Sequence, residues 1–215
     1  MPGSRRVTPL GTFIFSAIGA LFVAGVALLI WLALRDAGAM ITALESDGWS
    51  IERHPSSRIA WSARRVKAGV ATRIEVSTGG GVVKGGRTSV RMDADTGTDN
   101  VLVERNAPGF LAADGALASV VEFKPPPRWN GGSPAFVADY TAYASDENAA
   151  SRWLSETNQN AIIEYHHTAP RKVPIRFFQG ALETHWAGEP RDAAQIEGVV
   201  ALFERLRRAG AARRL

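Results

Sequence analysis

The sequence predicts an α+β protein in which one N-terminal transmembrane helix precedes a strand-rich antiparallel sheet domain with C-terminal helices. Three observations predict this class. Residues 10–34 contain no charged side chain, residues 49–123 contain short alternating segments bounded by Gly, Pro or Asp, and residues 192–209 carry an apolar stripe at helical spacing. Because 46 % of the residues are hydrophobic, the chain can bury a core.

Composition excludes several kinds of site. The chain has no cysteine, which excludes disulfides, thiolate catalysis and cysteine-ligated metal centres. Its formal net charge is +4, from 25 basic and 21 acidic side chains, and the excess lies largely in residues 205–215. So mild an excess, without a basic stripe on a known module, gives no reason to expect a nucleic-acid partner.

Residues 10–34 carry the strongest signal in the chain. At about 1.5 Å per residue, a helix of this length covers the roughly 30 Å hydrocarbon core of a bilayer. The apolar run exceeds the roughly 7–15 residues of a cleaved signal sequence and stops only at Arg35. We therefore expect a retained single-pass anchor in the inner (cytoplasmic) membrane, in contact with the lipid bilayer, after a basic tail at residues 1–9.

The distribution of basic residues sets the expected orientation of this anchor. Arg5 and Arg6 precede the span, whereas Arg35 is the one basic residue in the fifteen that follow it. The positive-inside rule then favours a cytoplasmic N-terminus and a periplasmic C-terminal domain. The alternative places the basic tail, residues 210–215, against the anionic cytoplasmic leaflet.

One face of the expected anchor consists of small side chains. Ser16, Ala20 and Ala24 recur every four residues, and Gly19 and Ala27 lie beside them. Small residues let a second membrane helix approach closely, so this face is a candidate for packing against other transmembrane subunits. The alternative is that Ala and Gly are simply common in membrane helices.

After the anchor we expect a helical stalk at residues 35–48. Met40, Ile41 and Leu44 are spaced for one face of a helix, and Gly48 is a suitable end. The soluble α+β domain then covers residues 49–209.

Strands are expected in the first half of this domain, at residues 49–53, 73–77, 89–94, 101–105 and 119–123. Residues 124–134 follow, with three consecutive prolines and two glycines, so they cannot form a helix or a central strand. We expect a stiff connector here that can divide the domain into two halves.

The second half carries clearer signals. The pattern predicts a strand at 136–144, then a helix capped by Ser145 that carries Trp153 and Leu154, and then a second helix at 161–166. A hairpin follows, in which strands at 173–179 and 182–187 flank Gly180 and Ala181, and the last helix covers 192–209. The last helix has the spacing of a core-facing stripe, formed by Ile196, Val199, Val200, Phe203 and Leu206.

This order of strand, two helices, hairpin and closing amphipathic helix, from Pro134 to Ala209, resembles the C-terminal region of uncharacterised single-span bacterial membrane proteins. The resemblance implies an α+β domain after the anchor. It carries no activity and no functional residues.

Residues 81–88 nearly match a phosphate-binding loop, with Arg87 where that motif has lysine. Such a loop works because a following helix directs its N-terminal N–H groups at the phosphates. Residues 89–100 alternate and then break into turn residues, which argues against a helix. We therefore expect a glycine-rich hairpin and no nucleotide.

A calcium-loop pattern is also incomplete. Acidic residues occupy positions 1, 3, 7 and 12 of a twelve-residue loop, namely Asp93, Asp95, Asp99 and Glu104. Gly97 at position 5 offers no side-chain ligand, and Thr98 replaces the glycine of position 6. We expect instead a hairpin that turns at Thr96 and Gly97 and pairs the strands on either side.

No other group of residues has the spacing of a metal or catalytic site. Adjacent residues point to different sides of a helix or strand, so His166 and His167 cannot chelate one ion simply, even with Glu164 nearby. His54 and His185 are isolated in the sequence. No nucleophile is spaced from a base, and we expect no catalytic residue, no metal and no cofactor.

Tryptophans mark candidate partner contacts. Trp31 ends the expected span, Trp49 and Trp61 follow it closely, and Trp129 lies in the Pro- and Gly-rich connector. Aromatic residues in such places are enriched at partner surfaces. The alternative is ordinary packing in the core or at the membrane interface.

These features favour a non-enzymatic accessory or stabilising subunit of a larger membrane complex, such as a respiratory or photosynthetic assembly. The alternative is a membrane-anchored binding or sensor module for a soluble or cell-envelope partner. A third hypothesis is an enzyme whose catalytic residues are dispersed in the sequence.

Overall fold

The computed structural model describes residues 21–28, 38–54, 59–77, 86–106, 126–169 and 173–212. It divides the chain into two compact units, Met1–Ala43 and Leu44–Leu215. The second unit is an α+β fold with one large antiparallel sheet and C-terminal helices, as the sequence predicts for this part of the chain.

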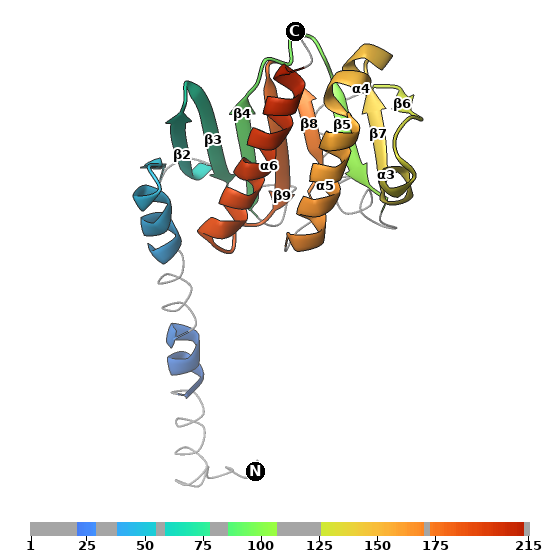
Figure 1. The fold of residues 1–215 in the computed structure, drawn as a ribbon. Coiled ribbons are helices and arrows are strands. Elements are labelled where there is room, and N and C mark those ends of the chain that lie inside the picture. The colour runs from blue at the N-terminus through green and yellow to red at the C-terminus, as the bar shows by residue number, and fades with distance from the viewer. Residues whose placement is uncertain are drawn as a thin grey trace, which may run out of the picture. The chain divides into compact units, whose positions relative to one another are not determined.

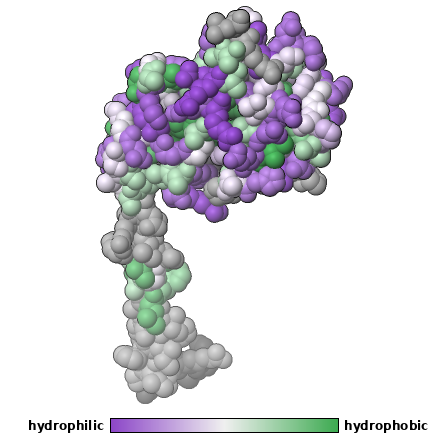
Figure 2. Space-filling model, viewed as in Figure 1, coloured by the Kyte–Doolittle hydropathy of each residue, from purple (hydrophilic) through white to green (hydrophobic). Residues whose placement is uncertain are grey.

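Within the first unit, residues 21–28 form a helix with an apolar surface. Leu21 and Phe22 are 74 % and 71 % exposed, and the surface of this helix is coloured hydrophobic in Figure 2. In the described part of the chain, no helix combines the length and the apolar character that crossing a bilayer requires. Most of the predicted span at residues 10–34 lies outside the described residues, so the span stays a prediction.

Residues 38–46 are helical, within the predicted stalk at 35–48. The helix ends at Gly48, as predicted, because its φ of +82° turns the chain out of the helix. The N–H of Trp49 then donates to the carbonyl of Leu44 at 3.1 Å, which satisfies a carbonyl of the last turn.

In the part of the chain that the structure describes, nine strands form a single sheet in the order β1-β2-β3-β4-β9-β8-β5-β7-β6, and every neighbouring pair is antiparallel. The strands are β1 Ser50–Arg53, β2 Ile59–Lys67, β3 Val70–Ser77, β4 Arg87–Asp93, β5 Val101–Arg105, β6 Arg128–Trp129, β7 Tyr140–Ala144, β8 Ile175–Phe178 and β9 Ala181–Ala187. Strands from both sides of residues 124–134 pair in this sheet, so that segment does not separate two sheets.

The strands predicted at 49–53, 89–94 and 101–105 are confirmed within two residues at each end, as β1, β4 and β5. The strand predicted at 73–77 is longer and begins at Val70. The strand predicted at 119–123 lies outside the described residues.

Strand β2 was not predicted, because two charged side chains break its apolar alternation. Arg65 and Lys67 lie on the face that packs against the helices, where they pair with Glu197 and Glu204. A two-residue turn at Ala68 and Gly69, both with positive φ, joins β2 to β3.

The predicted hairpin between the strands at 89–94 and 101–105 is wrong. Residues 97 and 98 do turn, but β5 pairs with β7 and β8, while β4 pairs with β9. The hairpin of β8 and β9 occupies the place between β4 and β5, so the two neighbours in sequence are separated by two strands in the sheet.

Four helices pack on one face of the sheet (Figure 1): α3 Pro134–Asp139, α4 Glu147–Trp153, α5 Glu156–Thr168 and α6 Ala193–Ala211. The last helix is confirmed, and Asp192 caps it by accepting from the N–H of Gln195 at 2.8 Å. The five residues of its predicted apolar stripe are all buried. Their burial against the sheet forms the centre of the core.

The strand predicted at 136–144 is wrong in its first half. Residues Pro134–Asp139 form α3, and the strand begins only at Tyr140. Ser133 caps this helix by accepting from the N–H of Phe136, and Pro134 at the first position has the φ of a helix. The Ser-Pro pair therefore begins a helix here, although the residues after it alternate between apolar and polar as in a strand.

Helix boundaries also differ in the next two elements. Asp146, and not the predicted Ser145, caps α4 by accepting from the N–H of Ala149 at 2.8 Å. Helix α5 begins at Glu156, five residues before the predicted start at 161. Two polar residues of its first turn, Asn158 and Gln159, are buried and donate to the carbonyls of Trp153 and Leu154.

The hairpin of β8 and β9 is confirmed, with its turn at Gln179 and Gly180, one residue earlier than predicted. Both turn residues have positive φ, of 47° and 74°, which is the conformation that a two-residue hairpin of this kind requires.

Two glycines of α6 have opposite surroundings. A Cβ on Gly210 would lie 2.3 Å from Cζ3 of Trp153, whose ring is 1 % exposed and packs against Phe177. A Cβ on Gly198 would lie 3.6 Å from Cε2 of Tyr165, an ordinary contact distance. Helix α6 can therefore pack over Trp153 only with glycine at position 210.

We expect Gly210→Ala to lower the free energy of unfolding by about 1–3 kcal/mol, because the buried indole cannot yield. Gly198→Ala, the control in the same helix, should raise it by up to about 1 kcal/mol, because alanine is the better helix former. Urea unfolding of the whole chain in a nonionic detergent, followed by tryptophan fluorescence, measures both. Equal effects of the two substitutions would contradict the packing described for Gly210.

Candidate anion-binding site

The small-residue face of the anchor is only partly described. Ala24 and Ala27 lie in the helix at residues 21–28, and both are exposed. The other members of the predicted face and one predicted aromatic contact lie outside the described residues: Ser16, Gly19, Ala20 and Trp31.

Two of the predicted partner contacts are buried in the domain itself. Trp49 and Trp61 are 3 % and 6 % exposed, so the prediction that they face a partner is wrong. The indole N–H of Trp49 donates to Glu197 at 2.7 Å, and the guanidinium of Arg65 lies 4.4 Å from the centre of its ring. Both tryptophans belong to the face of the sheet that the helices cover, and they complete its core.

Trp129 is half-buried in β6, at the edge of the sheet. Its indole N–H donates to Glu147 at 3.1 Å, and a Cβ on Gly131 would lie 2.4 Å from its ring. The ring is therefore fixed by the domain, and only part of it remains available to a partner.

The histidines are held in separate structural contacts. The carbonyl of Val173 can only accept, so His166 Nε2, at 3.1 Å, carries the proton and Nδ1 accepts from the hydroxyl of Tyr140 at 2.9 Å. His167 contacts the carbonyl of Ile163. His54 Nε2 lies 3.0 Å from the hydroxyl of Ser62. In the described ranges, no three His, Asp or Glu side chains are grouped as a metal ion would require.

The two ligand motifs considered in the sequence also fold differently. Strand β4 begins at Arg87, in the place where a phosphate loop needs a helix. Asp99, the seventh position of the calcium pattern, accepts from Arg152 at 2.5 Å and from the indole N–H of Trp153 at 2.8 Å. Its carboxylate therefore holds α4 to the sheet.

The candidate site lies on the other face of the sheet, which none of the helices α3 to α6 covers. Here strand register places Arg64 of β2 opposite Arg73 of β3, and Arg73 opposite Arg91 of β4. The row continues to Glu183 of β9 and Arg176 of β8. We call the first three residues the arginine ladder, and this side of the sheet the arginine face.

The arginine ladder is only partly neutralised. Arg91 pairs with Glu183 and donates to the carbonyl of Gln179 at 3.2 Å. Arg73 lies 3.7 Å from Glu75, but their side chains are 62 % and 40 % exposed, which makes the pair weak. For Arg64, no ion pair or hydrogen bond of its side chain occurs among the described residues. Like charges directly opposite one another destabilise a sheet, so the ladder opposes folding unless an anion binds.

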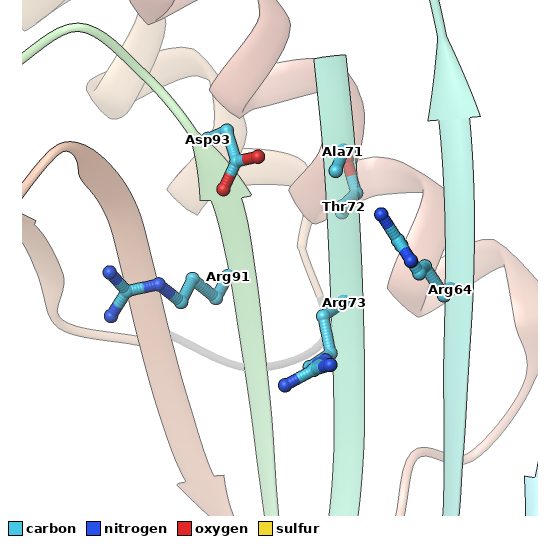
Figure 3. Close-up of a pocket in the computed structure, with 6 residues that line it drawn as sticks. All are labelled: Arg64, Ala71, Thr72, Arg73, Arg91 and Asp93. Atoms are coloured by element: carbon cyan, nitrogen blue, oxygen red, sulfur yellow. The ribbon is translucent and has the colours of Figure 1, made fainter.

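A hollow of about 230 Å³ opens beside the ladder. Its lining consists of Arg64, Ala71, Thr72, Arg73, Arg91 and Asp93. In Figure 3 the guanidinium of Arg64 and the carboxylate of Asp93 lean toward β3 from its two neighbouring strands, whereas the guanidinium of Arg91 points away toward β9. The hollow therefore has a cationic wall and an anionic wall over the small side chain of Ala71.

His185 reports the electrostatic character of the same face. It lies opposite Ser89, on the strand that also carries Glu183. Burial and, to a smaller extent, the positive charges of Arg87 and Arg176 together lower its pKa to about 4. Burial disfavours a charge of either sign at this position, and only the smaller contribution of the two arginines reflects a positive potential.

The arrangement has the donor groups that an oxyanion requires. Guanidinium groups donate in a planar fork that matches the oxygens of phosphate and carboxylate groups. The lining of the hollow contains one carboxylate, that of Asp93, and one hydroxyl, that of Thr72. Sequence reasoning missed the arginine ladder because Arg64, Arg73 and Arg91 become neighbours only through strand register, which no local pattern specifies.

His185 should make the protein less stable in acid. Its folded pKa is about 4, below the unfolded value of about 6.5, so the unfolded state binds the proton first. The contribution of neutral His185 is present above pH 6.5 and is lost as the pH falls toward 4. Urea midpoints of the whole chain between pH 7 and 4 should therefore fall more steeply for the wild type than for His185→Asn. Parallel profiles would contradict the lowered pKa.

The chain was compared with family models, with curated proteins and with solved structures, and none of them matches it. The resemblance of residues 134–209 to single-span bacterial membrane proteins therefore stays an expectation. The arginine face and the apolar helix of the first unit are the two surfaces of this chain that suggest binding partners.

Proposed function

We propose that this chain is a non-enzymatic, single-span accessory subunit that stabilises a larger membrane complex, such as a respiratory or photosynthetic assembly. In this proposal residues 10–34 cross the inner membrane, the N-terminal tail is cytoplasmic, and the α+β domain is periplasmic. The domain binds its partner protein through the arginine face, and neighbouring transmembrane subunits pack on the small-residue face of the anchor.

The exposed apolar side chains of residues 21–28 support the anchor. Leaving one large apolar side chain in water instead of burying it costs about 1.5–3 kcal/mol, and Leu21, Phe22 and Val23 are each more than half exposed. Lipid removes this cost. Ala24 and Ala27 lie in the same helix with exposed side chains, as helix packing in a membrane requires.

The single observation that carries the proposal is the positive charge of the arginine ladder, which the glutamates among the described residues neutralise only in part. Arg64, Arg73 and Arg91 are in direct register, although the repulsion costs stability. Arginine is enriched at interfaces, and a positive face steers an acidic partner into register. An acidic protein surface set against this face would neutralise the ladder, which explains why three arginines share one row.

The hollow favours a second candidate, a membrane-anchored binding or sensor module. Its cationic and anionic walls offer a small ligand contacts that a flat protein surface does not need. A module of this kind would act without stable association with a complex.

Removing two charges from the arginine face should release the chain from its complex. We expect the double variant Arg64→Gln/Arg73→Gln to lose at least about tenfold in co-migration with a large assembly, because fully desolvated charge contacts are worth 1.4 kcal/mol or more. Native membranes are solubilised in mild detergent, complexes are separated by size, and co-migrating proteins are identified by mass spectrometry.

The matched control removes two charges from the helical side of the same domain. Arg205 and Arg208 are 53 % and 71 % exposed and pair with Glu164 and Glu204. The variant Arg205→Gln/Arg208→Gln should co-migrate like the wild type. Wild-type migration near the mass of a monomer plus detergent would overturn the subunit proposal and favour the binding module.

The anchor makes an independent contribution. Ala20→Leu adds bulk to the small-residue face and should reduce co-migration while the chain stays in the membrane fraction, because neighbouring helices can no longer approach closely. Gly25→Leu adds the same bulk about 140° away around the helix, at 100° per residue, and should have no effect. An added Cβ at Gly25 meets no atom within 4 Å. Equal loss in both variants would argue against a specific helix face.

A further inference from the structure

The hollow on the arginine face holds two charged side chains that the described residues leave without a partner. Arg64 from β2 and Asp93 from β4 both line it, and in Figure 3 both lean toward Ala71 of β3. In the described ranges neither side chain forms an ion pair or a hydrogen bond. A ligand can therefore contact both without displacing an existing interaction.

The distance between the two walls fits a compact group. Neighbouring strands lie roughly 4.8 Å apart, so β2 and β4 are separated by about 10 Å across β3. The hollow of about 230 Å³ far exceeds the roughly 30 Å³ that one water molecule occupies in the liquid, and it is smaller than the roughly 300–1,000 Å³ of drug-sized pockets. A phosphate-sized group with some water fits this volume.

The chemistry of the walls selects among small anions. Arg64 and Arg73 can only donate hydrogen bonds, whereas the carboxylate of Asp93 accepts them. An oxyanion that has lost all its protons would meet repulsion from Asp93. An oxyanion that keeps one proton can bind the arginines through its unprotonated oxygens and donate that proton to Asp93.

We propose that this hollow is a binding site for a protonated oxyanion of the phosphate class, either hydrogen phosphate or the singly protonated form of a small phosphate monoester. The second pKa of such a monoester lies at about 6. Arg64 and Arg73 bind the anionic oxygens and relieve the repulsion within the arginine ladder. Asp93 accepts a hydrogen bond from the P–OH group and thereby distinguishes phosphate from sulfate, which carries no proton near neutral pH. This inference needs neither the membrane anchor nor a partner protein.

The test measures the melting temperature of the whole chain in a nonionic detergent against increasing phosphate, with ionic strength held constant by sodium chloride. A ligand that binds only the folded state raises this temperature in a saturable way. At ten times the dissociation constant we expect a rise of about 3–6 °C for a chain of this length. Sulfate at the same ionic strength should raise it by much less.

Three variants assign the effect to the hollow. Asp93→Asn should abolish the preference for phosphate, so that both anions give equal shifts. Arg64→Gln should lose both shifts, and it should fold at least as stably as the wild type because one like-charge contact is removed. Ala71→Leu should lose both shifts by filling the hollow without changing its charge. Arg205→Gln, on the helical side, is the control and should behave as the wild type.

Two results would overturn the proposal: a phosphate shift no larger than that of sodium chloride, or an unchanged preference for phosphate in Asp93→Asn. Each variant is first melted without anion, and one that does not fold is replaced by a second substitution, Asp93→Ser or Ala71→Met. Glycerol phosphate and a short-chain phosphatidic acid, with a short-chain phosphatidylcholine as control, distinguish a soluble source of the phosphate group from a lipid source.

These results are distinguishable from those on the proposed complex. Asp93→Asn makes the arginine face more positive, so co-migration with an acidic partner should persist in this variant while the preference for phosphate is lost. If Asp93→Asn no longer co-migrated with the assembly but phosphate still raised its melting temperature, the result would count against the subunit proposal alone.

Discussion

One constraint organises this domain: a strand directs alternate side chains to opposite faces of the sheet, so a sheet covered by helices on one side separates its residues into two sets. In β3 and β4 the buried set includes Ile74 and Val90, and α6 packs over this face. The remaining residues of the same strands form the arginine face. Arg65 of β2 is the exception, because its two hydrogen bonds to Glu197, at 2.8 and 2.9 Å, allow a cation among the buried set.

The arginine ladder lowers the stability of the fold through charge repulsion, while the same charges favour the binding of an anion. Packing of the core does not require Arg64 or Arg73, and any neutral polar residue there would avoid the repulsion. Arg205 and Arg208 on the helical side each pair with a glutamate, as Arg73 and Arg91 do, whereas Arg64 has no ion pair among the described residues. Destabilising arrangements of this kind are expected where a surface is shaped by what it binds and less by the fold alone.

Local sequence patterns were sufficient to predict those elements whose structure depends only on their own neighbouring residues. The stripe of α6, the caps at Asp146 and Asp192, and the glycine turn at residue 180 are all readable from a few neighbouring residues, although the cap of α4 was assigned one residue too early. Strand β2 and the arginine ladder were not readable. Both depend on residues far away in sequence, Glu197 for β2 and the strand register for the ladder, and neither is encoded in a local period.

Strand order has a consequence for the synthesis of this protein. The central pairing joins β4 to β9, and its first pair, Arg87 with Ala187, spans most of the domain. Until β9 has left the ribosome, the edge of β4 that faces away from β3 has no pairing strand, and β5 has not yet paired with β8. Long-range pairing of this kind slows folding, and an open edge invites pairing with another chain. With the membrane anchor proposed above, a nascent chain would pass this interval tethered to the membrane beside identical chains, and the timing of translation over β8 and β9 would then affect its yield.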